Sequence, residues 1–340
     1  MVTARRAPTL ACMSTVLPIA HEMWFDAKRF PLDWGFAGQR LTLIFLVLAV
    51  VATIAVRALA RLKPGVDVPV LAGLAPYMPF AVRLHLAVSL IGLLSMGTYL
   101  SPAMHLPNSV DGWVLGITMA GVGVLMATGF RARWAAALLI AAGPLGMLEF
   151  GVSPVLQRVD ILGLALFVLA AGAGRWSADY EQGRTGDPSL AASAAAIWSL
   201  RLAAGGALIV VAFVEKLANP QLALDFLAEH PHFNVAQEIG IHMTDLQFVR
   251  VAGVIEVLFG LLVISGALPQ LCVLIAGIPF NATLYFFGTE ELLGHLPIYG
   301  AMLVLLVYGS HPQLRPLVSA LRLPGRAHHA LPALRGALQS

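Results

Sequence analysis

The sequence predicts an all-α integral membrane protein with about nine transmembrane helices. Apolar residues make up 59% of the 340 positions, whereas Asp, Glu, Lys and Arg together make up only 11%. A mean hydropathy of +0.82 leaves too few polar side chains to cover a water-facing surface, so much of the surface must face lipid. Because lipid excludes open sheet edges, helices are the expected spanning elements.

Nine runs are apolar over the roughly 20 residues that are needed to cross a bilayer core. The first, at residues 40–61, is an extra span that follows an N-terminal segment at 1–39. The other eight runs lie at 79–100, 111–130, 134–152, 157–174, 196–216, 247–267, 270–288 and 294–310. A tail rich in Pro and Arg at 311–340 is expected to be disordered and cytoplasmic.

Lys and Arg residues in the connections predict the orientation. Ten of them lie on the side of the C-terminal tail, and the opposite connections carry three, namely Arg158, Lys216 and Arg250. By the positive-inside rule the C-terminus is cytoplasmic and, with nine spans, the N-terminus is outside. Four basic residues in the N-terminal segment oppose this orientation for the first span. Whether the chain starts at Met1 or at Met13 stays open.

The eight later spans are predicted to be one four-helix unit used twice, at 79–174 and 196–310. A shift of 118 residues aligns Arg83 with Arg201. A shift of 137 residues aligns Gly116 with Gly253, Gly123 with Gly260, Gly129 with Gly266, Phe150 with Phe287, Gly151 with Gly288 and Gly163 with Gly300. Repeats at a fixed period indicate one structural unit used twice, and four spans per unit give both copies the same orientation.

Glu256 is the strongest candidate for a functional residue. It lies about nine residues into the span 247–267, where a carboxylate is costly unless it is paired, protonated or faces a cavity. The aligned residue of the first unit is Met119, so the polar group belongs to the second unit. Lys216, or Arg201 deeper in the same helix, could instead neutralise Glu256 and lock the bundle, and this structural role stays open.

Histidines gather in the connections on the predicted outer side. His230, His232 and His242 follow the first span of the second unit, and His295 begins its last span. Imidazole nitrogen is a common ligand of zinc and copper, so these four histidines are candidate metal ligands. Their spacing matches no zinc motif, and loop histidines are more often solvated, so both interpretations stay open.

The second unit resembles the DoxX family of small four-span membrane proteins. The resemblance lies in residues 213–220 (FVEKLANP) and 252–266 (AGVIEVLFGLLVISG). Family members usually carry a Lys at the outer end of the first helix and a Glu inside the third, and Lys216 and Glu256 match these positions. The resemblance implies a bacterial plasma-membrane protein that is tied to a redox system, such as thiosulfate-to-quinone oxidation, with a membrane or extracytoplasmic redox protein as partner. The first unit then looks like a degenerate DoxX-like copy that lacks both groups.

Three function hypotheses follow. The first is a redox-associated membrane subunit, an oxidoreductase subunit if it is an enzyme, that binds a quinone or a similar lipophilic carrier in the second bundle. Glu256 and Lys216 would act on the bound molecule. Further residues expected to contact it are Asn281, His295, Tyr299 and Arg201. The second is a non-enzymatic scaffold or carrier for other membrane components. The third is an extracytoplasmic metal-binding membrane protein.

Composition and cysteine usage exclude several other classes. Cys12 and Cys272 lie 260 residues apart and no CxxC motif occurs, which excludes a zinc ribbon and a thioredoxin-type dithiol. The basic residues are scattered between apolar runs and form no basic face, so nucleic acid is not an expected partner.

Overall fold

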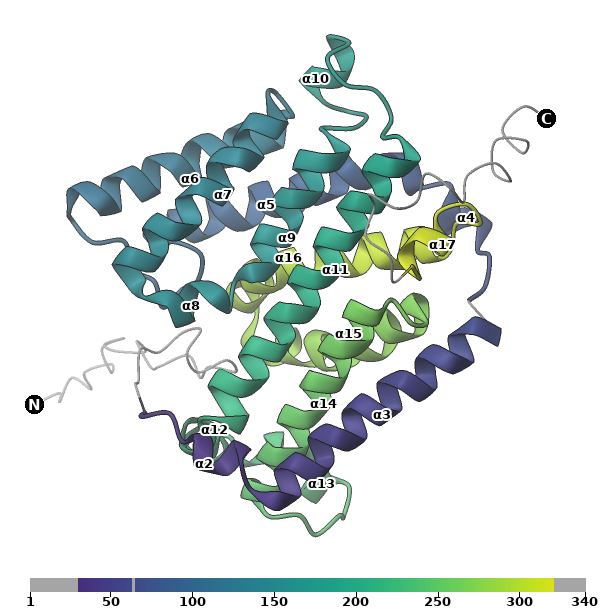
Figure 1. Ribbon diagram of the computed structural model, residues 1–340. Helices are drawn as coiled ribbons and strands as arrows, with labels where there is room; N and C mark the ends of the chain where they lie inside the picture. The colour runs from purple at the N-terminus through teal and green to yellow at the C-terminus, as the bar shows by residue number, and fades with distance from the viewer. Residues whose placement is uncertain (1–29, 63–64, 321–340) are drawn as a thin grey trace, which may run out of the picture.

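The computed structural model describes residues 30–62 and 65–320, and within these ranges every regular element is a helix (Figure 1). Among the described residues, seven helices are long and apolar enough to cross a membrane: Arg40–Leu62, Pro69–Ser95, Val110–Thr128, Ala132–Phe150, Leu190–Leu217, Asp245–Ser265 and Glu291–Gly309. The all-α class is therefore confirmed. The expected spans at 157–174 and 270–288 correspond to shorter apolar helical stretches, Val159–Ala171 and Pro269–Ala282.

The helices fall into an extra span and two groups of four long elements. The extra span is α3 (Arg40–Leu62), which follows the short α2 (Trp34–Ala37). The first unit comprises α5 (Met78–Ser95), α6 (Val110–Thr128), α7 (Ala132–Phe150) and α9 (Val159–Ala171), with the short α8 (Val152–Leu156) before α9. The second unit comprises α11 (Leu190–Ala212), α14 (Asp245–Ser265), α15 (Pro269–Phe287) and α16 (Thr289–Gly309).

Four shorter elements join α11 to α14. A π-helical turn, η2 (Phe213–Leu217), continues α11 directly. It is followed by α12 (Pro220–Glu229), the 3-10 helix η3 (Pro231–Phe233) and α13 (Val235–Glu238). A capping box then starts α14, because the Thr244 side chain accepts from the Gln247 backbone N–H and the Gln247 side chain accepts from the Thr244 backbone N–H. The end of the second unit that carries η2, α12 and α13 is called here the α12 end.

The two units pack on each other through α9 against α11 and α16 against α5 (Figure 1). Glycines allow close approach at both contacts. A Cβ on Gly163 of α9 would lie 2.5 Å from the Ala203 Cβ of α11, and a Cβ on Gly300 of α16 would lie 3.1 Å from the His85 Cβ of α5. Gly163 aligns with Gly300 by the 137-residue shift, and His85 aligns with Ala203 by the 118-residue shift. The two contacts therefore involve aligned positions.

Buried arginines close both units at the end opposite the α12 end. Arg83 of α5 donates to the carbonyls of Met126, Ala127, Ala173 and Trp176, and Arg201 of α11 donates to those of Val263, Ile264, Val318 and Ala320. Both side chains are fully buried. Gly129 and Gly266 end α6 and α14 in the left-handed conformation, with φ of 65° in each, directly against these guanidinium groups. Free carbonyls at the two helix ends are thereby satisfied.

The extra span α3 packs along the outer side of α14 (Figure 1). At the α12 end, Arg250 of α14 donates to Thr42 and Gln39 and lies over the Phe36 ring. At the other end, Arg57 of α3 donates to the carbonyls of Ser265 and Ser319. Most of the surface of α3 between these contacts is exposed, as expected for a helix that faces lipid.

The structure differs from the expected disordered tail over residues 311–320. These residues include α17 (Arg315–Val318), and the Val318 side chain is fully buried. Arg201 and Arg57 hold this segment through its carbonyls, which composition alone does not indicate. Predictions for the rest of the tail and for residues 1–29, including the start of the chain, lie outside the described residues.

Candidate functional site

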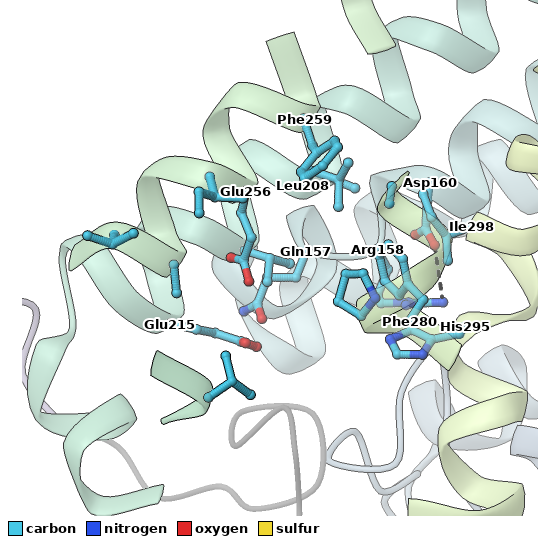
Figure 2. Close-up of a pocket in the computed structure, with 18 of the residues that line it drawn as sticks. Gln157, Arg158, Asp160, Leu208, Glu215, Glu256, Phe259, Phe280, His295 and Ile298 are labelled. Carbon is cyan, nitrogen blue, oxygen red and sulfur yellow. Dashed lines mark ion pairs between the residues drawn. The ribbon is translucent and has the colours of Figure 1, made fainter. Parts of the chain in front are cut away.

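A cavity of about 340 Å³ lies between the two units at the α12 end (Figure 2). Residues from α9, α11, η2, α13, α14, α15 and α16 line it. Most of the lining is aliphatic or aromatic, and six polar side chains interrupt it: Gln157, Arg158, Asp160, Glu215, Glu256 and His295. Sites for small molecules in proteins are typically about 300–1,000 Å³, mostly apolar, with a few polar groups. The cavity therefore has the size and chemistry of a small-molecule site.

An ion pair lies on the wall formed by η2 and α14. The Lys216 Nζ is 2.9 Å from the Glu256 Oε1, and the two side chains are 19% and 29% exposed. Glu256 lines the cavity, and its Oε2 is buried with no hydrogen-bond partner in the described part of the chain. The candidate role of Arg201 as partner of Glu256 is wrong, because Arg201 donates to carbonyls at the far end of α14.

The π-helical turn η2 places two charged neighbours on this wall. Glu215 is 5% exposed and lines the cavity, whereas Lys216 pairs with Glu256. π-helical turns are rare and occur frequently at functional sites. Trp34 of α2 stacks on Phe213 with ring centroids 6.1 Å apart, and the Asp33 N–H donates to the Ala218 carbonyl. The segment before the extra span therefore packs on this turn.

The opposite wall carries a second ion pair, which comes from the first unit. The Arg158 Nη2 lies 3.5 Å from the Asp160 Oδ2 (Figure 2). It also donates to the Gly294 carbonyl of α16 at 3.1 Å. Both side chains are at most 5% exposed. Asp160 lies in the first turn of α9, where the helix dipole favours a carboxylate. The Asp160 Oδ1 is buried and has no hydrogen-bond partner within the described residues.

His295 completes the polar lining on α16. Its Nδ1 lies 3.6 Å from the Glu291 Oε1, one helical turn away, and both residues are buried. The Phe280 ring of α15 meets the imidazole edge-on with centroids 4.9 Å apart. Imidazole nitrogens can donate or accept hydrogen bonds, and carboxylate oxygens accept them. The cavity thus contains several groups that can donate or accept hydrogen bonds.

Three of the expected pocket residues lie elsewhere. Arg201 lies at the end opposite the α12 end, where it donates to backbone carbonyls. Asn281 and Tyr299 line a shallow surface groove between α15 and α16. The Asn281 amide donates to the Gly277 carbonyl, and the Tyr299 hydroxyl donates to the Phe280 carbonyl. Of the expected residues, Glu256 and His295 line the cavity. Lys216 does not line it but forms the ion pair with Glu256.

The sequence analysis did not assign Gln157, Asp160 or Glu215 to the candidate site, and it treated Arg158 as a residue of a connection. All four are buried and line the cavity. The available signal was the placement of two charged residues, Arg158 and Asp160, at the very start of an apolar stretch. Their proximity to the second unit comes from the packing of α9 on α11, which the sequence does not indicate.

The candidate metal ligands are not brought together. His232 is exposed and lies 3.0 Å from Glu238, and His230 packs between Phe226 and Phe233. His242 is also exposed, whereas His295 is buried beside the cavity. Across residues 30–62 and 65–320, no three His, Cys, Asp or Glu side chains are grouped so as to hold a metal ion.

Comparisons of the chain with protein-family models, with curated proteins and with solved structures found no match. The resemblance to the DoxX family therefore rests on the motifs around Lys216 and Glu256.

Proposed function

We propose that this multi-pass membrane protein binds a small lipophilic molecule in the cavity, and that the molecule is a quinone or a similar redox carrier. The observation that carries the proposal is a mostly apolar cavity with titratable groups on two walls, Glu256 on one and Asp160 and His295 on the other. Quinone chemistry moves protons together with electrons, so such a carrier needs titratable groups in otherwise apolar surroundings. The DoxX-like motif supports a redox association of the same site.

Access from the bilayer is part of this proposal. Three lining residues are also exposed on the outer surface, namely Val235 of α13, Ile255 of α14 and Pro279 of α15. Ile255 is 44% exposed, and α14 and α15 are both apolar helices. We propose that a lipophilic molecule enters sideways between α14 and α15, near these exposed lining residues, without crossing water.

The finer membrane arrangement is also proposed. It comprises nine spans, with α9 and α15 as short spans, and two tandem DoxX-like units in a bacterial plasma membrane, with the N-terminus outside and the C-terminus cytoplasmic. The aligned roles of Arg83 and Arg201 and of Gly129 and Gly266 support the duplication. Within a compact pair of four-helix units, a short helix spans where its neighbours thin the local bilayer or where its flanking residues snorkel.

Filling the cavity tests the proposal. Ala276 lines the cavity and is 7% exposed, whereas Ile278 lies two residues further along the same helix, faces outward and does not line it. We expect Ala276→Phe to weaken binding of a short-chain quinone at least tenfold in nanodiscs, measured by equilibrium dialysis, and Ile278→Phe to leave binding unchanged. Undiminished binding by a well-folded Ala276→Phe protein would exclude this cavity as the site.

A second candidate function is a non-enzymatic scaffold for other membrane components. The observation that favours it is the closed pair between Lys216 and Glu256, which neutralises both charges and joins η2 to α14 without any ligand. A scaffold needs this pair for stability alone, so the two functions differ in what loss of the pair does to ligand binding.

A further inference from the structure

Two buried carboxylate oxygens at the cavity have no hydrogen-bond partner within the described residues, Asp160 Oδ1 and Glu256 Oε2. Asp160 is 3% exposed. Both Asp160 and Glu256 line the cavity. Buried polar atoms in folded proteins nearly always have a partner, so an orphan pair that borders one cavity points to a missing ligand.

The other oxygen of each carboxylate faces a cation. Asp160 Oδ2 lies 3.5 Å from the Arg158 guanidinium, and Glu256 Oε1 lies 2.9 Å from the Lys216 ammonium. A nearby positive charge favours the ionised carboxylate. In the ion-paired form each carboxylate has no proton to donate, so both orphan oxygens are then acceptors only.

The two orphan acceptors come from different units. Asp160 belongs to α9 of the first unit and Glu256 to α14 of the second, and the two side chains lie on opposite sides of the pocket (Figure 2). A ligand that satisfies both must therefore present a hydrogen-bond donor at each of two ends, with an apolar body between them.

We propose that the cavity selects a lipophilic hydrogen-bond donor with hydroxyl groups at both ends, and that it binds a hydroquinone more tightly than the corresponding quinone. This inference rests on the proposed function, that the cavity holds a lipophilic carrier. A hydroquinone donates from both of its ends, whereas a quinone carries carbonyl oxygens that only accept and would face the carboxylate oxygens without a proton between them.

Preferential binding of the reduced form has an electrochemical consequence. Each tenfold preference for the hydroquinone makes the bound couple easier to reduce and raises its midpoint potential by about 30 mV, since two electrons are transferred. A quinone bound at the site would therefore be a stronger oxidant than the same quinone free in the membrane.

The direct test compares three ligands on the full-length protein in nanodiscs under anaerobic conditions. They are duroquinol, duroquinone and the dimethyl ether of duroquinol, which keeps the ring but has no hydroxyl hydrogen. We expect duroquinol to bind at least tenfold more tightly than either of the others. Equal affinities, or tighter binding of duroquinone, would overturn the donor preference and leave the proposed function standing. If none of the three binds, the proposed function fails as well.

Two carboxylate variants with a matched control locate the preference. Asp160→Asn and Glu256→Gln keep the shape of the side chain but replace one acceptor oxygen by a donor amide. Each is expected to reduce the preference for duroquinol at least tenfold. Glu149→Gln, the same kind of change at an exposed residue of α7, is expected to leave it unchanged. Unaltered preference in both cavity variants would contradict the proposal, and the ligand comparison on the unmodified chain remains decisive if either variant does not fold.

Discussion

Lys216 and Glu256 form an ion pair that joins the π-helical turn η2 to the middle of α14, with Nζ and Oε1 2.9 Å apart. The pair lies in apolar surroundings and keeps partial exposure toward the cavity on the side of Glu256. Desolvated charges in such a position depend on each other, because removal of one leaves the other uncompensated.

Removing one partner of the pair should lower the free energy of unfolding more than removing both partners. We expect Lys216→Met or Glu256→Gln alone to lower the free energy of unfolding by about 3 kcal/mol, at the low end for a buried pair because both side chains keep some exposure. The double variant should recover part of this loss. Chemical unfolding in detergent measures the cycle, and equal losses in the single and double variants would refute a coupled pair.

The same variants separate the two candidate functions. For a carrier site, Glu256→Gln should weaken duroquinol binding beyond any loss of stability, because Glu256 lines the cavity. For a scaffold, stability falls and no ligand binding is lost. Thermal unfolding and equilibrium dialysis on one protein preparation provide both quantities.

Glycines against the two buried guanidinium groups should resist substitution. A Cβ on Gly266 would lie 2.6 Å from the Arg201 Cζ, and one on Gly129 would lie 2.8 Å from the Arg83 Cζ, both at φ of 65°. We expect Gly266→Ala and Gly129→Ala each to cost at least about 1 kcal/mol, since left-handed backbone and a steric clash act together. Gly121→Ala on α6, with open space around its Cβ position, should be neutral or slightly stabilising. Thermal unfolding compares the three.

Orientation can be measured with single cysteines. Glu181 lies near the connection after α9, Glu238 lies in α13 at the α12 end, and both are exposed. In a chain with Cys12 and Cys272 replaced, the proposed orientation predicts that Glu238→Cys reacts with an impermeant maleimide on intact cells. Glu181→Cys should react only after permeabilisation. The reverse pattern would invert the proposed topology.

A pH effect is expected at the exposed pair Arg175–Asp187, outside the spanning helices. Two hydrogen bonds from the guanidinium lower the pKa of the Asp187 carboxyl. A lowered folded-state pKa contributes stability above the unfolded pKa, and this contribution is lost as pH falls through the folded value. Asp187→Asn should therefore be slightly less stable than the unmodified chain at neutral pH and equal to it in strong acid. Unfolding midpoints across acid pH measure the difference, and a constant difference would argue against the pair.

The sequence predicted the helices better than it predicted the cavity. Hydropathy located α3 within one residue of its observed end, and the 137-residue shift maps Ala132–Phe150 onto Pro269–Phe287. Apolar length and internal repetition are local properties, so the sequence carries them directly. Lys216 was likewise anticipated as a partner of Glu256, because both belong to neighbouring spans.

The wall formed by Arg158 and Asp160 could not be predicted because it depends on how one unit sits on the other. Gly163 lets α9 approach α11 closely, and this contact carries both charged residues to the cavity. Tyr299 was expected to contact the bound molecule. The structure instead has Tyr299 on the groove side, with Phe280 in contact with both rings.

The hydrogen bonds of Arg250 and Arg57, which hold α3 against α14, determine whether the extra span can be removed from the chain. Arg250 lies in the second turn of α14, and its described partners Phe36, Gln39 and Thr42 lie in the segment from α2 to the first turn of α3. A chain that begins after residue 62 would lack these partners and would leave the Arg250 guanidinium facing the bilayer. It would also leave the Ser265 carbonyl without the Arg57 donor. The extra span α3 is thus a structural part of the second unit, and the second unit depends on it.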